Sequence, residues 1–268
     1  MKICIPSKDR AATIKTHLFF KPKDVLIFVE PQEVKKYKIF WPDYTIIDIK
    51  KSDQGISYAR NFIIDNTDDD KLIMADDDIN YFGLRNDEYR YDKINDLSEM
   101  IDDIDKGLDD YLGYSIPSDV FAYFQNKSTN QLRFHVNKKS LVSFYGLNNE
   151  GLKKHNIHFD NALEIDDLDF TIQIILNSGS VCSDYKYAMS HDMRTLGGIM
   201  SMRKLNSFSV DLTIREHIRQ LSSKYGAEFI NFTHDENGFA HSCSINIDLL
   251  QKRKEIAKKN YEEYLTRV

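Results

Sequence analysis

Short apolar runs alternate with amphipathic segments along the first third of the chain. The runs are rich in Ile, Val, Leu and Phe and are bounded by polar residues or proline, which is typical of buried strands. They cover residues 2–6, 24–30, 44–49 and 71–75. Between them, residues 32–38 and 55–66 have apolar side chains at helical spacing, and residues 11–19 form a shorter helical segment. This alternation predicts an α/β fold in which a mostly parallel sheet carries helices on both faces.

The pattern is more mixed in the rest of the chain. It predicts helices over residues 97–112, 167–177, 211–224 and 249–265, and strands over residues 120–125, 133–143 and 181–189. Two short strands, residues 229–232 and 240–245, are expected to pair around the turn at Asn237 and Gly238. Since no low-complexity linker separates these elements, we expect one α/β domain over residues 1–205. Helices and a hairpin over residues 206–268 would pack on it.

The net charge of the chain is −6 but is unevenly distributed. Residues 1–110 contain 17 Lys and Arg against 24 Asp and Glu, a balance of −7, which leaves +1 for the remainder. Bulk charge therefore argues against a protein that coats nucleic acid or an anionic membrane. Three cysteines are too few for a disulfide framework, and no apolar run approaches the ~20 residues of a membrane helix. We expect a soluble, cytoplasmic protein with no membrane partner and no signal peptide.

Three adjacent carboxylates, Asp76, Asp77 and Asp78, directly follow the apolar strand at residues 71–75. In open α/β sheets, ligands bind beyond the carboxyl ends of the strands. Three neighbouring negative charges repel one another unless a cation shares them. Since residues 76 and 78 point to the same side of an extended chain, these two can hold a hard divalent ion together.

The cluster has two other interpretations. A solvated acidic turn is the simpler one, and it fits the nearby Asp68–Asp70. An EF-hand loop matches only at its first ligand positions, because Tyr81 stands where the loop requires glycine and Asp87 where it requires glutamate. The position after a buried strand favours a metal role for Asp76–Asp78.

Five segments, taken in order, resemble the GT-A glycosyltransferases. They are the strand and loop at residues 5–10, the G-x-x-x-ARN helix start at residues 55–61, the DxD motif at residues 76–78, the acidic segment at residues 166–170, and Ser190-His191-Asp192. Within that fold the chain resembles the TET-associated glycosyltransferases, many of them from phages, which are thought to glycosylate hydroxymethylated pyrimidines in DNA. The resemblance covers roughly residues 1–200 and implies a GT-A-like, Rossmann-like central sheet with flanking helices.

The resemblance implies a nucleotide-sugar donor, with UDP as the expected nucleotide. It also implies a divalent cation, Mn²⁺ or Mg²⁺, to neutralise the diphosphate leaving group. The cation would be held by Asp76, Asp78 and His191, and a histidine ligand favours Mn²⁺. Asp77 is expected to meet the sugar or the ribose. The other expected donor-binding residues are Pro6, Ser7 and Arg10 after the first strand, Gly55 and Arg60 at a helix start, and Gly197 and Gly198 in a later turn.

The acceptor hydroxyl needs a base if the reaction inverts the anomeric centre. The acidic segment offers Glu164, Asp166, Asp167 and Asp169 at a helix start, where the helix dipole stabilises carboxylates and where capping alone accounts for one or two of them. We predict Asp167 as the base, with Asp166 as the second choice. Asp166 stands where the family usually has glutamate. A retaining reaction needs no dedicated base, and the sequence leaves both outcomes open.

A DNA acceptor would need a local basic surface on this acidic chain. Residues 186–224 contain seven Lys and Arg against three Asp and Glu, a balance of +4. A solvated helix face explains this stretch equally well. The candidate acceptor-binding residues are Arg194, Arg203 and Lys204, and residues 206–268 are a candidate acceptor-binding element.

The predicted function is therefore metal-dependent transfer of a sugar from a nucleotide sugar to a hydroxymethylated pyrimidine in DNA. If the chain is phage-encoded, the reaction would take place in the host cytoplasm. The main alternative keeps the fold and chemistry but has a saccharide or protein acceptor. A nucleotidyltransferase would need a basic or Gly-Ser phosphate loop, which Gly55-Ile56-Ser57 matches poorly. A catalytically silent binding module is the remaining alternative.

Overall fold

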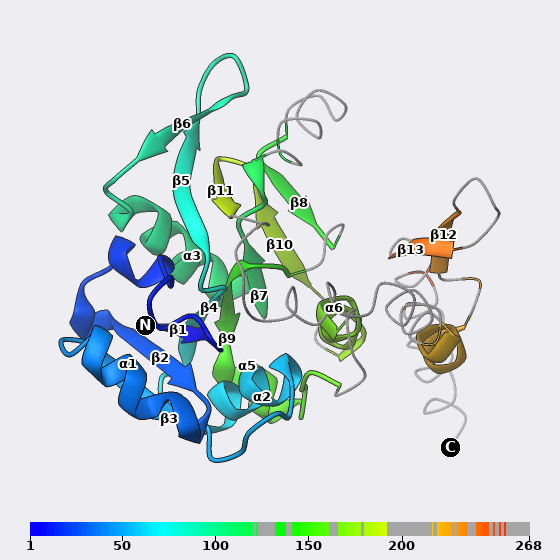
Figure 1. Cartoon of the computed structure of the whole chain (residues 1–268). Helices are drawn as coiled ribbons and strands as arrows, with labels where there is room; N and C mark the ends of the chain where they lie inside the picture. Colours follow the sequence, from blue (N-terminus) through cyan, green and yellow to red (C-terminus); the bar gives the residue numbers. More distant parts are fainter. Residues whose placement is uncertain are drawn as a thin grey trace.

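The structure is a computed structural model of the 268-residue chain (Figure 1). It describes most of the N-terminal two thirds and parts of the C-terminal third. The described residues are 1–119, 122, 132–137, 141–160, 166–177, 180–191, 216, 219–226, 228, 230–234, 240–246, 249, 252 and 255. Of the predicted strand at residues 120–125 only Ala122 is described, and it is helical instead, with its amide donating to the Ser118 carbonyl at 2.8 Å. Most of the predicted helix at residues 249–265 lies outside the described residues.

A large central sheet confirms the predicted fold class. Its strands, in spatial order, are β3 (Thr45–Asp48), β2 (Val25–Val29), β1 (Lys2–Pro6), β4 (Lys71–Ala75), β9 (Phe144–Asn148), β7 (Gly113–Ser115), β10 (Val181–Asp184) and β8 (Phe134–Val136). The first four pair in parallel, as do β7 and β10, whereas β9 runs antiparallel to β4 and β7, and β8 runs antiparallel to β10. The sheet is therefore mostly parallel, and β1 and β4 at its centre end side by side.

Helices cover both faces of this sheet, as the alternating pattern predicts. They are α1 (Val34–Phe40), α2 (Ile56–Asn66), α3 (Ser98–Asp110), α5 (Asn149–Lys154) and α6 (Asp166–Asn177), with short 3₁₀ turns η1 (Thr16–Phe19), η2 (Pro22–Asp24) and η3 (Pro31–Glu33). The predicted helix at residues 11–19 is thus only the 3₁₀ turn η1. That segment is instead held by backbone hydrogen bonds to the end of β4, a long-range contact with no local signal.

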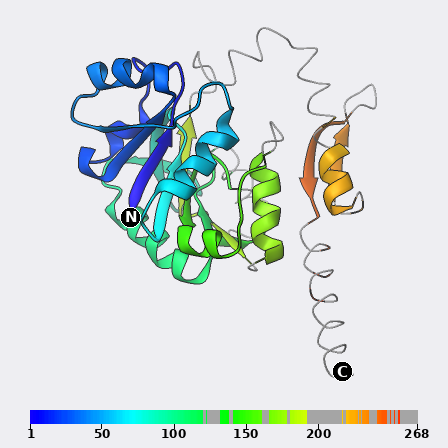
Figure 2. The ribbon, with the colours of Figure 1, turned by 90° about the horizontal axis from the view of Figure 1, so that it is seen from below.

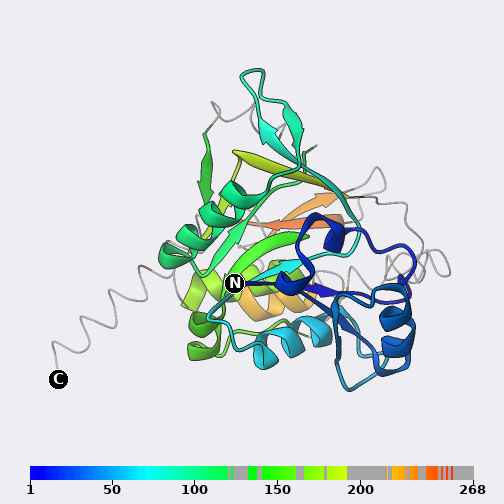
Figure 3. The ribbon, with the colours of Figure 1, turned by 90° about the vertical axis from the view of Figure 1, so that its left-hand side faces the viewer.

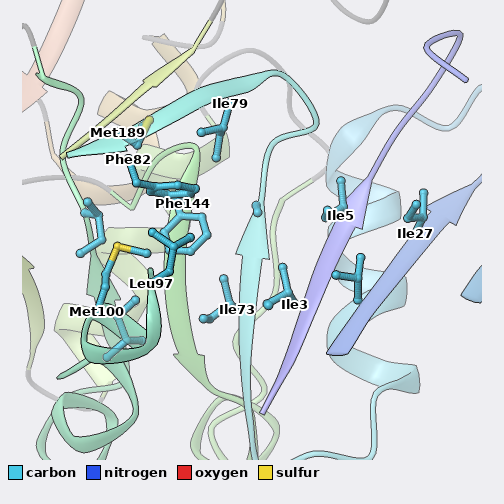
Figure 4. Packing of buried hydrophobic residues seen from close by; sticks show 14 of the residues in the cluster. Ile3, Ile5, Ile27, Ile73, Ile79, Phe82, Leu97, Met100, Phe144 and Met189 are labelled. Carbon is cyan, nitrogen blue, oxygen red and sulfur yellow. The ribbon is translucent and has the colours of Figure 1, made fainter. Parts of the chain in front are cut away.

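The central strands are buried on both faces, and their side chains alternate between two hydrophobic clusters. On β1, Ile3 and Ile5 pack on one face with Met100 of α3, and Cys4 packs on the other with Ile63 of α2. Figure 4 shows the first cluster, in which side chains from β1, β2 and β4 lie beside those of α3 and β9. Burial on both faces explains why these strands form continuous apolar runs in the sequence.

A second, three-stranded antiparallel sheet was not predicted. Its strands, in order, are β11 (Tyr187–His191), β5 (Ile79–Arg85) and β6 (Tyr91–Ile94), and the β5–β6 hairpin projects from the body of the protein (Figures 1 and 3). The single strand predicted over residues 181–189 is in fact β10 and β11, which belong to different sheets. Among the described residues of the strand predicted over 133–143, only β8 is a strand, and the next strand, β9, was missed. Periodicity does not show where an apolar run changes sheets.

The C-terminal hairpin is confirmed by β12 (Ile230–His234) and β13 (Ala240–Ile245), which pair antiparallel. Residues 219–225 are helical, as predicted (Figure 2). It contacts α6 through Lys224 Nζ and the Tyr225 hydroxyl, which lie 2.9 Å and 2.7 Å from Asp169 Oδ1. Asp169 is buried and also accepts from Gln173 of the same helix.

A buried ion pair fixes the far edge of the central sheet. Asp184 of β10 has no exposed surface and accepts from Arg133 Nε at 2.9 Å and from Arg133 Nη2 at 2.8 Å. The Tyr114 hydroxyl of β7 donates to the same carboxylate at 2.8 Å. Since an uncompensated buried charge is strongly unfavourable, this pair links β7, β8 and β10.

Replacing Arg133→Met is therefore expected to lower the free energy of unfolding by about 2 kcal/mol, because Asp184 loses its cation while Tyr114 still donates to it. Urea denaturation followed by circular dichroism measures the change. Arg90→Met is the matched control, since the Arg90 side chain is 68% exposed and its Nε lies 3.9 Å from Glu88 Oε2, too far for a hydrogen bond. Equal stability of the two variants would show that the Asp184 pair contributes nothing.

Candidate active site

The loop after β1 and the DxD segment after β4 are held together by backbone contacts. Thr16 Oγ1 donates to the Asp76 carbonyl at 2.6 Å, and the Lys15 amide donates to the Asp77 carbonyl at 2.9 Å. From the opposite side, the Asp76 amide donates to the Ser143 carbonyl at 2.7 Å. The carboxyl ends of adjacent parallel strands thus meet at one sheet edge, as the sequence predicts.

Asp77 points into the protein. Its carboxylate accepts from the Ser7 hydroxyl and forms an ion pair with Arg10, both in the loop after Pro6. Ser7 in turn lies 2.7 Å from the Tyr37 hydroxyl of α1. Burial raises the pKa of Asp77 to about 6, although Arg10 and Ser7 lower it. The contacts of Asp77 in this structure are therefore with the β1 loop, which was expected to form the donor wall.

Asp76 and Asp78 are more accessible than Asp77. The side chain of Asp76 is 35% exposed and that of Asp78 is 14% exposed, against 6% for Asp77. Asp78 Oδ2 lies 3.1 Å from Arg10 Nη1, and Asp76 Oδ1 lies 3.5 Å from Arg60 Nη2. Burial and the neighbouring Asp76 raise the pKa of Asp78. Each of the two carboxylates thus has an arginine beside it.

Arg60 connects the DxD segment to the acidic helix start. Gly55 precedes α2 with a φ of +83°, a conformation that glycine adopts without strain. One turn later, Arg60 Nη1 lies 3.1–3.2 Å from both oxygens of Asp166 at the start of α6. The Ser57 hydroxyl donates to Asp166 at 2.9 Å. Burial lowers the pKa of Arg60, but the surrounding acidic groups raise it more, so the guanidinium stays charged.

The two candidate bases have different surroundings. Asp166 is buried and is paired with Arg60 and Ser57, whereas Asp167 is only partly buried. The amide of Asp167 donates to Asp166 Oδ1 at 3.0 Å. Burial raises the pKa of Asp167 to about 7. The charge of Arg60 lowers this pKa, whereas the neighbouring Asp166 raises it. A base that ionises near neutral pH suits proton abstraction, so Asp167 is the better candidate of the two.

His191 lies next to the DxD segment. It is the last residue of β11 and pairs with Ile79, the first residue after Asp78. Its Nδ1 atom is buried without a hydrogen-bond partner, and the ring is close enough to Asp78 to act on that carboxylate electrostatically. A ring nitrogen without a partner and a nearby carboxylate are ligand types that a cation such as Mn²⁺ accepts.

The side chains of Asp76, Asp78 and His191 fit a divalent cation in chemical type. They are not drawn together around a common point: among the residues that the structure describes, no group of three His, Cys, Asp or Glu side chains is arranged to hold a metal ion. Arg10, a cation of the protein itself, lies beside Asp78 instead.

The remaining predicted residues are only partly tested. Arg194, Gly197, Gly198, Arg203 and Lys204 lie outside the described residues. Three other basic residues of the 186–224 stretch are described, and all three contact carboxylates: Lys186 with Glu99 and Asp103, Arg219 with Glu216, and Lys224 with Asp160 and Asp169. These three therefore add little free positive charge for a DNA backbone.

Several residues of the site were missed by the sequence analysis. Ser57 and Thr16 bind the acidic segments directly, and the signal for Ser57 was its place in the first helical turn after Gly55. The Arg60 guanidinium also lies 5.2 Å from the ring centroid of Phe159. Tyr145 of β9 is buried beside Arg60, and nothing in its local sequence indicates that.

Residues 1–203 match the family described as TET-associated glycosyltransferase. The chain belongs to this family. The match covers the segments that carried the resemblance in the sequence, and it confirms the predicted family. No curated protein matches the chain.

Solved structures confirm the GT-A fold of this family member. TarS 1-349 from S. aureus in complex with UDP-GlcNAc superposes with a TM-score of 0.51 at 15% identity, over 83% of this chain and 67% of that one. Glucosyl-3-phosphoglycerate synthase from Mycobacterium tuberculosis, in complex with Mn²⁺, UDP and glucosyl-3-phosphoglycerate, superposes with a TM-score of 0.50 at 11% identity. The match covers 81% of this chain and 78% of that one. A mycobacterial protein superposes with a TM-score of 0.52 at 12% identity, over 91% of this chain and 82% of that one.

The chain is shorter than some of these relatives. It spans 59% of the length of TarS 1-349 in another crystal structure of that protein. None of the described helices is long and apolar enough to cross a membrane.

Replacing Arg60→Met is expected to lower the free energy of unfolding by about 3 kcal/mol, because it leaves Asp166 buried without its cation. The double variant with Asp166→Asn is expected to recover part of this loss, since the unpaired charge is gone. A double-mutant cycle by urea denaturation measures the coupling. Additive effects of the two substitutions would contradict the ion pair.

The raised pKa of Asp167 also predicts a pH-dependent stability. Between about pH 4 and pH 7 the folded protein keeps a proton on Asp167 that the unfolded chain releases, so this group's contribution to stability falls as pH rises through that window. Asp167→Asn removes the effect. Compared with the wild type, this variant is expected to gain stability on going from pH 4.5 to pH 8, as measured by thermal unfolding. The matched control is Asp110→Asn, at the exposed end of α3.

Proposed function

We propose that this protein is a metal-dependent glycosyltransferase that transfers a sugar from a UDP-sugar to a hydroxymethylated pyrimidine in DNA. One observation carries the chemistry: Arg60 joins the DxD segment after β4 to the acidic start of α6 at the carboxyl edge of the sheet. Membership of the TET-associated glycosyltransferase family supports the reaction type and the DNA acceptor.

In this proposal Asp76, Asp78 and His191 hold the divalent cation, Mn²⁺ or Mg²⁺. When bound, the cation neutralises the charge that develops on the diphosphate leaving group. Arg10 forms an ion pair with Asp78, and this ion pair would have to break for Asp78 to bind the cation. Asp77 keeps Ser7 and Arg10 in place, so that the loop after Pro6 can contact the base and ribose. Gly197 and Gly198, which lie outside the described residues, are the remaining proposed donor contacts.

The reaction proposed is a direct displacement. The acceptor hydroxyl oxygen forms a bond to the anomeric carbon, and the bond from that carbon to the diphosphate oxygen breaks, with its electron pair leaving on the nucleotide. The hydroxyl proton passes to the Asp167 carboxylate. Asp166, held by Arg60 and Ser57, fixes the start of α6 on which Asp167 lies. This assigns an inverting reaction, which the anomeric configuration of the product tests.

The acceptor would be contacted over a small face. Arg194, Arg203 and Lys204 are the proposed contacts, with residues 206–268 as an acceptor-binding element attached to the 1–205 domain. The described basic residues of the 186–224 stretch, Lys186, Arg219 and Lys224, are already paired with carboxylates. This pairing agrees with limited contact to DNA better than with non-specific coating of DNA. The free, buried Cys4 and Cys182 agree with the proposed cytoplasmic location.

The decisive experiment has two stages. First, the protein with Mn²⁺ is offered a panel of UDP- and GDP-sugars, and donor hydrolysis is measured with and without EDTA. Second, DNA containing hydroxymethylcytosine is incubated with the best donor and its nucleosides are analysed by mass spectrometry, with unmodified DNA as the control acceptor. We expect a mass increase of one sugar on hydroxymethylcytosine only.

The outcomes separate the parts of the proposal. Donor hydrolysis without a mass increase on DNA rejects the DNA acceptor and leaves a transferase for a saccharide or protein acceptor. No hydrolysis of any donor rejects the transferase. Asp78→Asn is expected to reduce turnover at least 100-fold by loss of the cation site, whereas Asp70→Asn, before the same strand, should keep it.

Turnover is also expected to depend on pH through Asp167. Because the base must be ionised, kcat/KM should fall below a midpoint near pH 7 and level off above it. Asp167→Asn should abolish this acidic limb together with most of the activity. A rate that is flat between pH 5.5 and pH 8.5 would exclude Asp167 as the base.

A further inference from the structure

The helix at residues 219–225 contacts the start of α6 with two side chains. Lys224 Nζ lies 2.9 Å, and the Tyr225 hydroxyl 2.7 Å, from the same oxygen, Asp169 Oδ1. The other oxygen of this carboxylate accepts from Gln173 Nε2 at 2.6 Å. Asp169 is only 4% exposed, so three donors compensate a charge that is otherwise costly to bury.

Lys224 is the cation of this cluster. Among the residues that the structure describes, no other Lys or Arg pairs with Asp169. Lys224 Nζ also lies 3.2 Å from Asp160 Oδ2, so one ammonium connects the first turn of α6 with the chain that precedes this helix. Burial lowers the pKa of Lys224, but Asp169 and Asp160 raise it more, so the ammonium stays charged.

The end of the helix at residues 219–225 is itself fixed. Gly226 has a φ of +106°, and its amide donates to the Ser222 carbonyl at 2.9 Å, which closes the helix directly after its two contact residues. Lys224 thus lies in the last turn of one helix and Asp169 in the first turn of the other. Helix dipoles favour a cation at the first of these places and an anion at the second, so the contact is complementary in charge.

The first turn of α6 is therefore anchored from two sides. Arg60 of α2 binds both oxygens of Asp166. One turn later, the helix at residues 219–225 binds Asp169. Asp167 lies between these two anchors, and its own side chain is only partly buried. Since the residues of one helical turn move together, the direction of the Asp167 carboxylate depends on both anchors.

We propose that Lys224 and Tyr225 are positioning residues, which hold the first turn of α6 so that the Asp167 carboxylate faces the acceptor hydroxyl. Both lie beyond residue 203, where the match to the family ends, so an element outside the matched segment completes the site. The helix at residues 219–225 therefore contributes to the chemistry as well as to the proposed acceptor binding. The proposal rests on the proposed role of Asp167 as the base.

The first test measures hydrogen–deuterium exchange of the full chain by mass spectrometry and needs no substrate. Lys224→Met should raise the exchange rate of the amides at residues 170–174 of α6 about fivefold, because Asp169 loses its cation and the helix start opens more often. Lys224→Arg keeps the cation and should leave this rate unchanged. Unchanged exchange of α6 in Lys224→Met would overturn the proposal.

The matched control for exchange is Arg219→Met. Arg219 lies on the same helix as Lys224, but its side chain is 75% exposed and pairs with Glu216, three residues earlier. Its replacement should leave the exchange of α6 unchanged. A rise equal to that in Lys224→Met would show that any weakening of this helix has the same effect, and would reject a specific role of Lys224.

Tyr225→Phe is a milder variant for the case that Lys224→Met does not fold. It removes the hydroxyl that donates to Asp169 and keeps the ring, whose centroid lies 5.3 Å from Lys224 Nζ. The exchange of α6 should rise in this variant, by less than in Lys224→Met. If the rate does not change, the Tyr225 contact does not hold α6.

The second test compares kcat with stability. Lys224→Met should lower kcat about tenfold through misplacement of Asp167, with KM for the donor unchanged because the DxD segment keeps its own contacts. Lys224→Arg should retain kcat. Adding Asp169→Asn to Lys224→Met removes the unpaired charge, so the urea midpoint should recover while kcat does not. Recovery of both together would show a purely structural contact and would overturn the positioning role.

The two tests separate this proposal from the proposed function. If the wild type turns over no donor, the proposed function is rejected, and the exchange data alone decide whether Lys224 and Tyr225 anchor α6. If the wild type is active and the exchange of α6 rises in Lys224→Met without a loss of kcat, the positioning role is rejected while the proposed function stands.

Discussion

The site depends on the ion pairs that the buried guanidinium of Arg60 forms with Asp166 and Asp76. The guanidinium binds both oxygens of Asp166 and lies beside Asp76, two carboxylates that are 90 residues apart in the chain. Neither acidic segment could be held at the sheet edge in isolation, because several buried negative charges would repel one another. One cation on α2 therefore brings the DxD segment and the start of α6 together.

The three aspartates of the DxD segment, which lie in the turn between β4 and β5, have different surroundings. Asp77 points inward to Ser7 and Arg10 and fixes the loop after β1. Asp76 and Asp78 lie on the more open side, where His191 approaches from β11. Along β1 and β4, side-chain alternation divides the apolar residues between two clusters, and the DxD turn begins directly where β4 leaves this core.

The predictable parts of the structure are those with a local cause. Apolar runs bounded by polar residues predicted β1, β2, β3 and β4, and helical spacing predicted α2 and α6. The β5–β6 hairpin was missed because its strands mix polar, aromatic and apolar residues without a clear period. β10 and β11 were merged because only the two residues Tyr185 and Lys186 separate them, and neither is a glycine, proline or asparagine that would mark a turn.

The sequence by itself determined the fold class, the family and the acidic segments that carry the chemistry. Each of these depends on residues close together in the chain, where side-chain period and motif spacing are direct consequences of backbone geometry. Only the tertiary structure decided that Asp77 turns inward, that Arg60 joins Asp76 to Asp166, and that Tyr145 lies among them. Those relations depend on burial and charge between distant segments, and no local pattern records them.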